Sequence, residues 1–267
     1  MYLTDYHTHS LCSPDGKCPL TAMAQAAVDA GLAELCVTDH WDLVREMGDG
    51  LILDYDWTGV LEQVAQARAV FDEHTLKIRM GMELGSGQRS PEHADAVLAK
   101  VDVDFVIGSL HNMTAENGGR DFFFVEYTAP EVCYAALDDY FTSMEQLAPL
   151  DCYDVLGHII YPLRYFPEAF HISLDDYWER LEPILKTVVA HGKGIEVNTY
   201  RGKTLSEWKP VLELYRACGG ELVTTGSDAH VTSSVGKGIP EAMELLRSCG
   251  FRYVTTYERR QPQQHKL

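Results

Sequence analysis

Several features are missing from this sequence, and each absence narrows the function. No apolar run approaches the ~20 residues that a helix needs to cross a bilayer. The opening residues, MYLTDYHTHS, lack the basic and apolar regions of a secretory signal. No Pro/Gly/Ser-rich linker or repeat divides the chain, which predicts a single domain over residues 1–267. We therefore expect a cytoplasmic protein with no membrane partner.

Cysteine pairs of the kind found in disulfide frameworks or zinc motifs are also missing. The seven cysteines are odd in number, and none stands in a C-x-x-C pair. This pattern predicts reduced, mostly buried thiols. Cys12 and Cys18 lie near a pair of histidines, but a carboxylate-rich site favours packing over ligation for them.

Positive charge is scarce in this chain. There are 22 Lys and Arg against 40 Asp and Glu, giving a formal net charge of -18, and no basic cluster stands out. A nucleic-acid-binding protein is expected to present a basic patch, so we expect no nucleic-acid partner. A small anionic ligand would need a local positive centre, such as bound metal ions, to overcome the surrounding field.

Short apolar segments rich in β-formers alternate with helical patterns along the whole chain. The predicted strands are 2–6, 34–38, 77–82, 103–108, 153–157, 193–198 and 221–225, with 252–256 as an extra edge strand. The predicted helices are 19–30, 57–74, 91–100, 130–147, 174–191, 207–218 and 239–248. Seven such units predict an α/β barrel with a parallel sheet, and an open doubly wound sheet is the alternative. Two long irregular stretches, 39–56 and 109–129, would overhang the C-terminal face of the strands.

Residues that can bind metal stand at the C-terminal ends of nearly all these strands. In chain order they are His7, His9, Asp15, Asp39, His40, Glu83, His111, His158, Asn198, Asp228 and His230. Six of the eleven histidines belong to this set, whereas a lone histidine is usually a surface or core residue. Because the strand ends of a barrel converge on one mouth, the pattern predicts a metal site there. Mixed imidazole and carboxylate donors suit Zn, Mn or Fe, and a bridging Glu83 makes two or three ions more plausible than one.

The ordered motifs DYHTHS, TDH, GMELG, GSLHN, LGH and GSDAH resemble those of the polymerase and histidinol phosphatase (PHP) family, from His7 to about Gly250. The resemblance implies a distorted (β/α)7 TIM-like barrel with three divalent metal ions at the C-terminal face of the strands. The implied ligands are His7, His9, Glu83 and Asp228 for one ion, Glu83, His111 and His158 for a second, and Asp15, His40 and His230 for a third.

Asp15 departs from part of the family. Some members carry histidine there, but the larger, stand-alone histidinol phosphatases often carry aspartate, so the departure favours that branch. A turn residue in Pro-Asp-Gly is the alternative role for Asp15. Glu83, Asp228 and His230 are the predicted catalytic residues, and at Asp228 and His230 a ligand role competes with acid catalysis.

Two arginines favour a phosphate substrate. Arg164 and Arg201 follow the fifth and sixth predicted strands. The family's phosphatases place arginines in comparable loops, and a guanidinium fork matches phosphate oxygens. Solvated surface charge is the alternative role for both. Asp42, Glu46 and Asp49, in the loop after the second strand, would receive a cationic substrate or else serve as solvated loop charges.

The resemblance, together with the metal-binding residues and the two arginines, implies a metal-dependent phosphomonoesterase that hydrolyses L-histidinol phosphate to L-histidinol and phosphate. A PHP-type phosphoesterase acting on nucleotides or nucleic-acid 3′ ends is the first alternative, which the charge balance and the lack of a stacking tract disfavour. An amidohydrolase also opens with His-x-His, but it needs a metal-bridging lysine where this chain offers His111. A non-catalytic metal-binding module is the alternative from another class.

Overall fold

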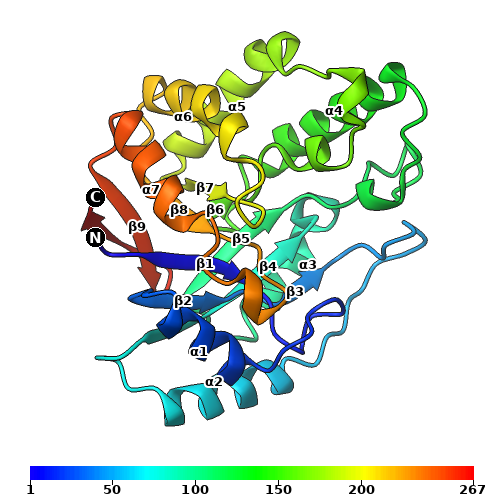
Figure 1. The fold of residues 1–267 in the computed structure, drawn as a ribbon. Helices are drawn as coiled ribbons and strands as arrows, with labels where there is room; N and C mark the ends of the chain where they lie inside the picture. Colours follow the sequence, from blue (N-terminus) through cyan, green and yellow to red (C-terminus); the bar gives the residue numbers. More distant parts are fainter.

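A parallel sheet curled into a barrel forms the centre of the computed structural model, which describes residues 1–267 (Figure 1). Along the sheet the strands run in the order β1 (Thr4–Thr8), β2 (Glu34–Val37), β4 (Lys77–Gly85), β5 (Phe105–Ser109), β6 (Val155–Leu156), β7 (Gly194–Asn198) and β8 (Val223–Gly226). Every neighbouring pair in this order is parallel. The predicted α/β barrel is therefore confirmed, and the open doubly wound sheet is not what forms.

The first and last strands meet and nearly close the barrel. Thr8 pairs with Ala229 in a parallel bridge. The amides of Asp228 and His9 donate to the carbonyls of His7 and Ala229, each over 2.9 Å. Closure therefore places the two histidines of the first motif beside the aspartate of the last one.

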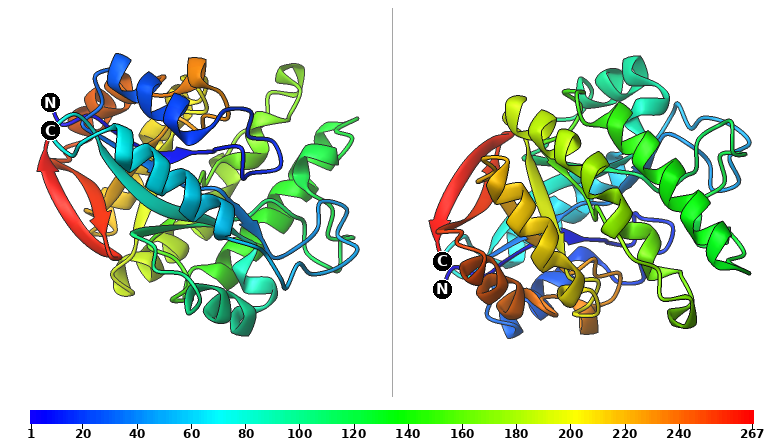
Figure 2. Two further views of the ribbon diagram at one scale, coloured as in Figure 1. Left: turned by 90° about the horizontal axis from the view of Figure 1, so that it is seen from below. Right: turned by 90° about the horizontal axis from the view of Figure 1, so that it is seen from above.

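Seven α-helices cover the outside of the barrel (Figure 2). They are α1 (Leu20–Asp29), α2 (Thr58–Val70), α3 (Pro91–Leu98), α4 (Pro130–Leu147), α5 (Trp178–Ala190), α6 (Leu205–Ala217) and α7 (Ile239–Ser248). All seven overlap the predicted helices, although a 3-10 turn at Asp175–Tyr177 precedes α5. No helix combines the length and the apolar character that crossing a membrane requires.

Two apolar cores hold the layers together. The larger one lies between the helices and the outer face of the strands. The smaller one fills the inside of the barrel and consists of Tyr6, Cys36, Phe105, Ile107, Val155 and Tyr257. The register between β1 and β2 shifts between Asp5 and Thr8, and both Tyr6 and the next residue, His7, contact groups in the barrel interior.

One strand stands where the sequence predicted an irregular stretch. Within 39–56, residues His40–Asp42 form β3, which pairs with β4. The register sets His40 opposite Glu83. Because the strand is only three residues long, it leaves no periodic signal in the sequence.

A C-terminal hairpin covers the end of the barrel where the strands begin. The predicted edge strand 252–256 corresponds to β9 (Tyr253–Glu258), which pairs antiparallel with β10 (Gln261–Lys266) and not with the barrel sheet. The Tyr257 amide donates to the Tyr6 hydroxyl over 3.0 Å, and the hairpin lies beside the end of the barrel where β1 begins, next to the chain termini (Figure 1). β10, with the sequence QPQQHK, is mostly exposed and polar, which is why its composition did not predict a strand.

Asp5 fixes the chain after β8 to the first strand. Its carboxylate is fully buried and accepts hydrogen bonds from the Ser227 amide (2.8 Å), the Ser227 hydroxyl (2.5 Å) and the Gly236 amide (2.9 Å). These donors flank the loop that carries Asp228 and His230. A single buried carboxylate therefore holds the barrel's closing loop in place.

The substitution Asp5→Asn should lower the free energy of unfolding by about 2–3 kcal/mol, because an amide NH2 would face donors that need an acceptor. Urea denaturation measures the change. Asp49→Asn, on an exposed loop, is the matched control and should stay within about 0.5 kcal/mol of the parent protein. Equal stability of the two variants would contradict this role for Asp5.

Candidate metal centre

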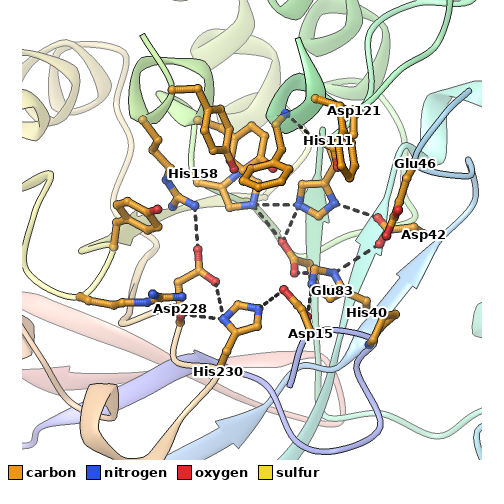
Figure 3. Close-up of a pocket in the computed structure, with 18 residues that line it drawn as sticks. Asp15, His40, Asp42, Glu46, Glu83, His111, Asp121, His158, Asp228 and His230 are labelled. Atoms are coloured by element: carbon orange, nitrogen blue, oxygen red, sulfur yellow. Dashed lines mark hydrogen bonds and ion pairs between the residues drawn. The ribbon is translucent and has the colours of Figure 1, made fainter. Parts of the chain in front are cut away.

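The nine residues predicted as metal ligands and the two predicted arginines, eleven in all, meet at the C-terminal end of the barrel (Figure 3). They surround a pocket of about 340 Å³. Nine of them line it, while His7 and His9 are fully buried with a ring nitrogen within 3.5 Å of Glu83. Asp42 and Glu46 also line this pocket, whereas Asp49 does not.

Glu83, near the end of β4, lies at the centre of the site. Ring nitrogens of five histidines approach its two oxygens, at 3.2 Å for His7, 3.5 Å for His9, 3.0 Å for His40, 3.1 Å for His111 and 2.9 Å for His158. Burial by itself would raise the pKa of this carboxyl, but the neighbouring imidazoles lower it well below its usual range. Glu83 is therefore ionised and faces rings from several strands (Figure 3).

Three groups of side chains have the spacing expected of ligands around one ion. In each group, one donor atom per residue lies within 4.8 Å of the others: His7, His9 and Asp228; His40, Glu83 and His111; His9, His40 and His230. Asp15 extends the last group, since its carboxylate lies 2.8 Å from His230 Nε2 and 3.7 Å from His40 Nε2. The structure thus brings Asp15 to the site, although its side chain is 59 % exposed.

Several buried donor atoms of these residues have no hydrogen-bond partner. They are His7 Nε2, His9 Nε2, His40 Nδ1, Glu83 Oε2 and His230 Nε2. Buried polar atoms are normally paired, and these converge on one another without hydrogen-bond geometry. Imidazole nitrogens and carboxylate oxygens arranged in this way fit divalent metal ions.

His9 is held in the form that binds metal. Burial, together with the nearby His230 and His40 rings, lowers the pKa of His9 to about 3. The ring is therefore neutral at physiological pH, and its Nδ1 lies 3.0 Å from the Ser13 hydroxyl, which in turn donates to Asp39 over 2.7 Å. This chain of contacts leaves the Nε2 lone pair of His9 directed at Glu83 and Asp228.

Polar groups lie behind the ligands, and of these Glu196 was assigned no role from the sequence, while Asp42 was predicted to receive a substrate and not to contact a ligand. Asp42 Oδ1 lies 2.8 Å from His111 Nδ1, and Glu196 Oε1 lies 2.6 Å from His7 Nδ1. Glu196 left one usable signal, a charged residue at an interior position of the otherwise apolar stretch GIEV. Asn198, at the end of the same strand, donates to Asp228 over 3.3 Å.

Both predicted arginines line the pocket. The side chain of Arg164 is 4 % exposed, and its Nη1 donates to Asp228 Oδ2 over 2.8 Å, while its Nε has no partner. Arg164 also stacks over the ring of Tyr200 at 4.3 Å. Tyr200 and Arg201 have φ of 42° and 60°, and the buried Nε of Arg201 is likewise unpaired. Two unpaired guanidinium donors in a pocket are suited to an anion.

The wall beyond Asp42 combines acidic and aromatic groups. Asp121, which the sequence did not single out, lines it with Glu46, Phe123 and Phe124. Burial first, and then the carboxylates of Asp42 and Glu46, raise the pKa of Asp121. The pocket therefore has one side with the guanidinium groups of Arg164 and Arg201 and another side where Glu46 and Asp121 form no ion pair.

Fold and site together define a metal-binding α/β barrel whose donors converge at the C-terminal strand ends, where barrel enzymes carry their active sites. Within that class the assignment is direct. The PHP domain model matches residues 5–200, and the chain belongs to the PHP family.

Named relatives extend over nearly the whole chain. It is 31% identical over 269 residues to the "probable histidinol-phosphatase" of Deinococcus radiodurans, covering 97% of this chain and 98% of the relative. It is 26% identical to the histidinol-phosphatase of Lactococcus lactis, and the match covers 95% of this chain and 93% of the relative. The crystal structure of the Lactococcus lactis histidinol phosphate phosphatase, complexed with Zn, L-histidinol and phosphate, superposes with a TM-score of 0.81 at 24% identity over 98% of this chain and 99% of that one. This superposition shows the shared fold.

Replacing Glu83 by Gln should abolish the stabilisation that metal gives this protein. The neutral amide keeps the volume but removes the charge that several donor groups share, so added Zn or Mn should no longer raise the Tm of chelator-treated protein. Differential scanning fluorimetry measures this shift. Glu46→Gln removes a carboxylate from the same pocket without touching the donor groups and should keep the parental shift. A full metal-induced shift in Glu83→Gln would overturn the central role of Glu83.

Proposed function

We propose that this protein is a metal-dependent phosphomonoesterase that hydrolyses L-histidinol phosphate to L-histidinol and phosphate. The observation that carries the proposal is a single pocket with two opposite sides. One side holds the metal donors with Arg164 and Arg201, and the other holds Glu46 and Asp121 with exposed phenyl rings. A phosphate monoester of a cationic, ring-bearing alcohol matches both sides. The full-length likeness to proteins named histidinol-phosphatase supports the same assignment.

The proposed cofactors are three divalent ions, Zn, Mn or Fe. Their proposed ligands are His7, His9, Glu83 and Asp228; Glu83, His111 and His158; and Asp15, His40 and His230. When bound, the ions would neutralise phosphoryl oxygens and make water nucleophilic at neutral pH. Only three ligand carboxylates oppose them, so the mouth would be positive within a protein of net charge -18.

The chain's own residues position the substrate. The unpaired Nε atoms of Arg164 and Arg201 donate to the phosphate in this proposal. Asp228 holds Arg164 through one oxygen and turns the other toward His7 and His9, so one side chain links the phosphate subsite to the donor groups. Positioning and charge stabilisation supply most of the rate enhancement.

At the leaving-group side, Glu46 and Asp121 receive the cationic groups of histidinol and Phe123 packs against its ring. Asp42 is less available, because His111 and His40 already lie against its oxygens at 2.8 and 3.4 Å. The free carboxylates disfavour a polyanionic strand, which is why nucleic-acid 3′ ends remain the weaker alternative. The seven cysteines are all free thiols, which supports our proposal of a cytoplasmic location.

A substrate panel tests the function directly. Purified protein loaded with Zn or Mn should release phosphate from histidinol phosphate with a kcat/KM at least about tenfold above that for nucleoside monophosphates, and should not shorten single-stranded oligonucleotides. His9→Ala should lose the phosphatase activity while remaining folded by circular dichroism. Preference for nucleotides, or unchanged turnover in His9→Ala, would rule the proposal out.

The cationic subsite gives a separate prediction. Asp121→Asn should raise the KM for histidinol phosphate about 10- to 100-fold, because a charge-assisted hydrogen bond would be lost. The KM for p-nitrophenyl phosphate, which has no cationic group, should change little. Asp49→Asn, outside the pocket, is the control. An equal rise for both substrates would show that Asp121 supports the loop and does not select the substrate.

A further inference from the structure

Glu196 is a buried carboxylate in the barrel interior whose purpose the proposed function leaves open. It lies on β7, where Ile195 and Val197 point into the outer apolar core. Alternation along the strand therefore turns Glu196 and Asn198 toward the inside of the barrel. The residue is 1 % exposed and does not line the pocket, so substrate does not touch it.

Both oxygens of Glu196 are bonded to residues of the donor set. Oε1 lies 2.6 Å from His7 Nδ1, and Oε2 accepts from the His158 amide over 2.9 Å. Asn198 Nδ2 adds a third contact to Oε1 at 3.2 Å. No lysine or arginine forms an ion pair with Glu196. A buried carboxylate without a permanent cation is expensive to maintain, which points to a purpose beyond packing.

Glu196 can reach His7 only if the strand between β7 and β1 carries no side chain at that point. β7 and β1 are not neighbours, since β8 stands between them in the sheet. Gly226 on β8 provides the gap, because a Cβ there would lie 2.4 Å from Glu196 Oε1 and 2.4 Å from the Cβ of His7. The barrel thus keeps a residue without a side chain at the one place where Glu196 reaches across.

We propose that Glu196 is a positioning residue that fixes the tautomer and direction of His7 and sets the backbone of His158. A carboxylate that accepts the Nδ1 proton leaves the Nε2 lone pair free, and Nε2 of His7 is the atom that lies 3.2 Å from Glu83 and 3.7 Å from Asp228. One carboxylate on β7 thereby orients one donor on β1 and one donor that follows β6. Its effect on catalysis rests on the proposed phosphatase function, whereas its effect on metal binding does not.

Glu196→Gln tests this assignment against a matched control. The amide offers one acceptor where His7 and His158 require two, so zinc affinity should fall about 10- to 100-fold in competition with a chromogenic chelator. Glu34→Gln is the control, because Glu34 is equally buried on β2 but bonds Tyr6 and Arg79 at the opposite end of the barrel. It should keep zinc affinity within about twofold of the parent. Equal losses in the two variants would overturn the proposal.

Nitrogen-15 NMR of histidine-labelled, zinc-loaded protein reports which ring nitrogen of His7 carries the proton. A purely structural role of Glu196 would not change that position. In the parent protein the His7 proton is expected on Nδ1, with a strongly downfield signal, and Glu196→Gln should shift that signal upfield. A proton on Nε2 of His7 in the parent would overturn the proposal even if the variant fails to fold. If the parent releases no phosphate from histidinol phosphate, the proposed function fails, while zinc affinity and the tautomer still decide the role of Glu196.

Discussion

The buried carboxylate of Glu83 is the contact on which the rest of this site depends. Five imidazoles approach its two oxygens, and they come from β1, from β3 and from the loops after β5 and β6. One negative charge cannot satisfy so many donor atoms by hydrogen bonding, and several of them have no partner at all. Divalent ions among these atoms would stabilise the arrangement, and their binding would then add to the free energy of unfolding.

The two ends of the barrel differ in the residues they contain. At the N-terminal end, Tyr6, Glu34 and Arg79 form a hydrogen-bonded group that the β9–β10 hairpin covers. At the other end, apolar packing gives way to imidazoles and carboxylates. Tyr6 and His7 are adjacent in sequence, and the register of β1 shifts at this point. Tyr6 therefore joins the hydrogen-bonded group at the N-terminal end, while His7 joins the site at the C-terminal end. With the proposed divalent ions bound, this mouth would be a positive region in a protein of net charge -18.

The sequence was sufficient to predict the barrel and to predict that eleven site residues converge at one end of it. Both predictions rest on local signals, the hydrophobic periodicity and the position of polar residues at strand ends. It missed β3, which is three residues long, and β10, which is polar. It also missed the partners that lie across the barrel: Glu196 meets His7 from 189 residues away, and only the closed sheet brings them together. Asp121 was hidden for a similar reason, since its neighbours Asp42 and Glu46 belong to β3 and the loop after it. The ligand roles themselves stay predictions.

The backbone at Asp228 restricts which acid can stand there. Its φ of 58° is in the left-handed region, where aspartate and asparagine are tolerated better than longer side chains. Glutamate binds divalent ions as well as aspartate does, so coordination chemistry alone would accept either. The turn after β8 adds a conformational preference, because the same peptide must hold this φ and donate its amide to the carbonyl of His7. At this position the main-chain conformation, and not the coordination chemistry, favours aspartate over glutamate.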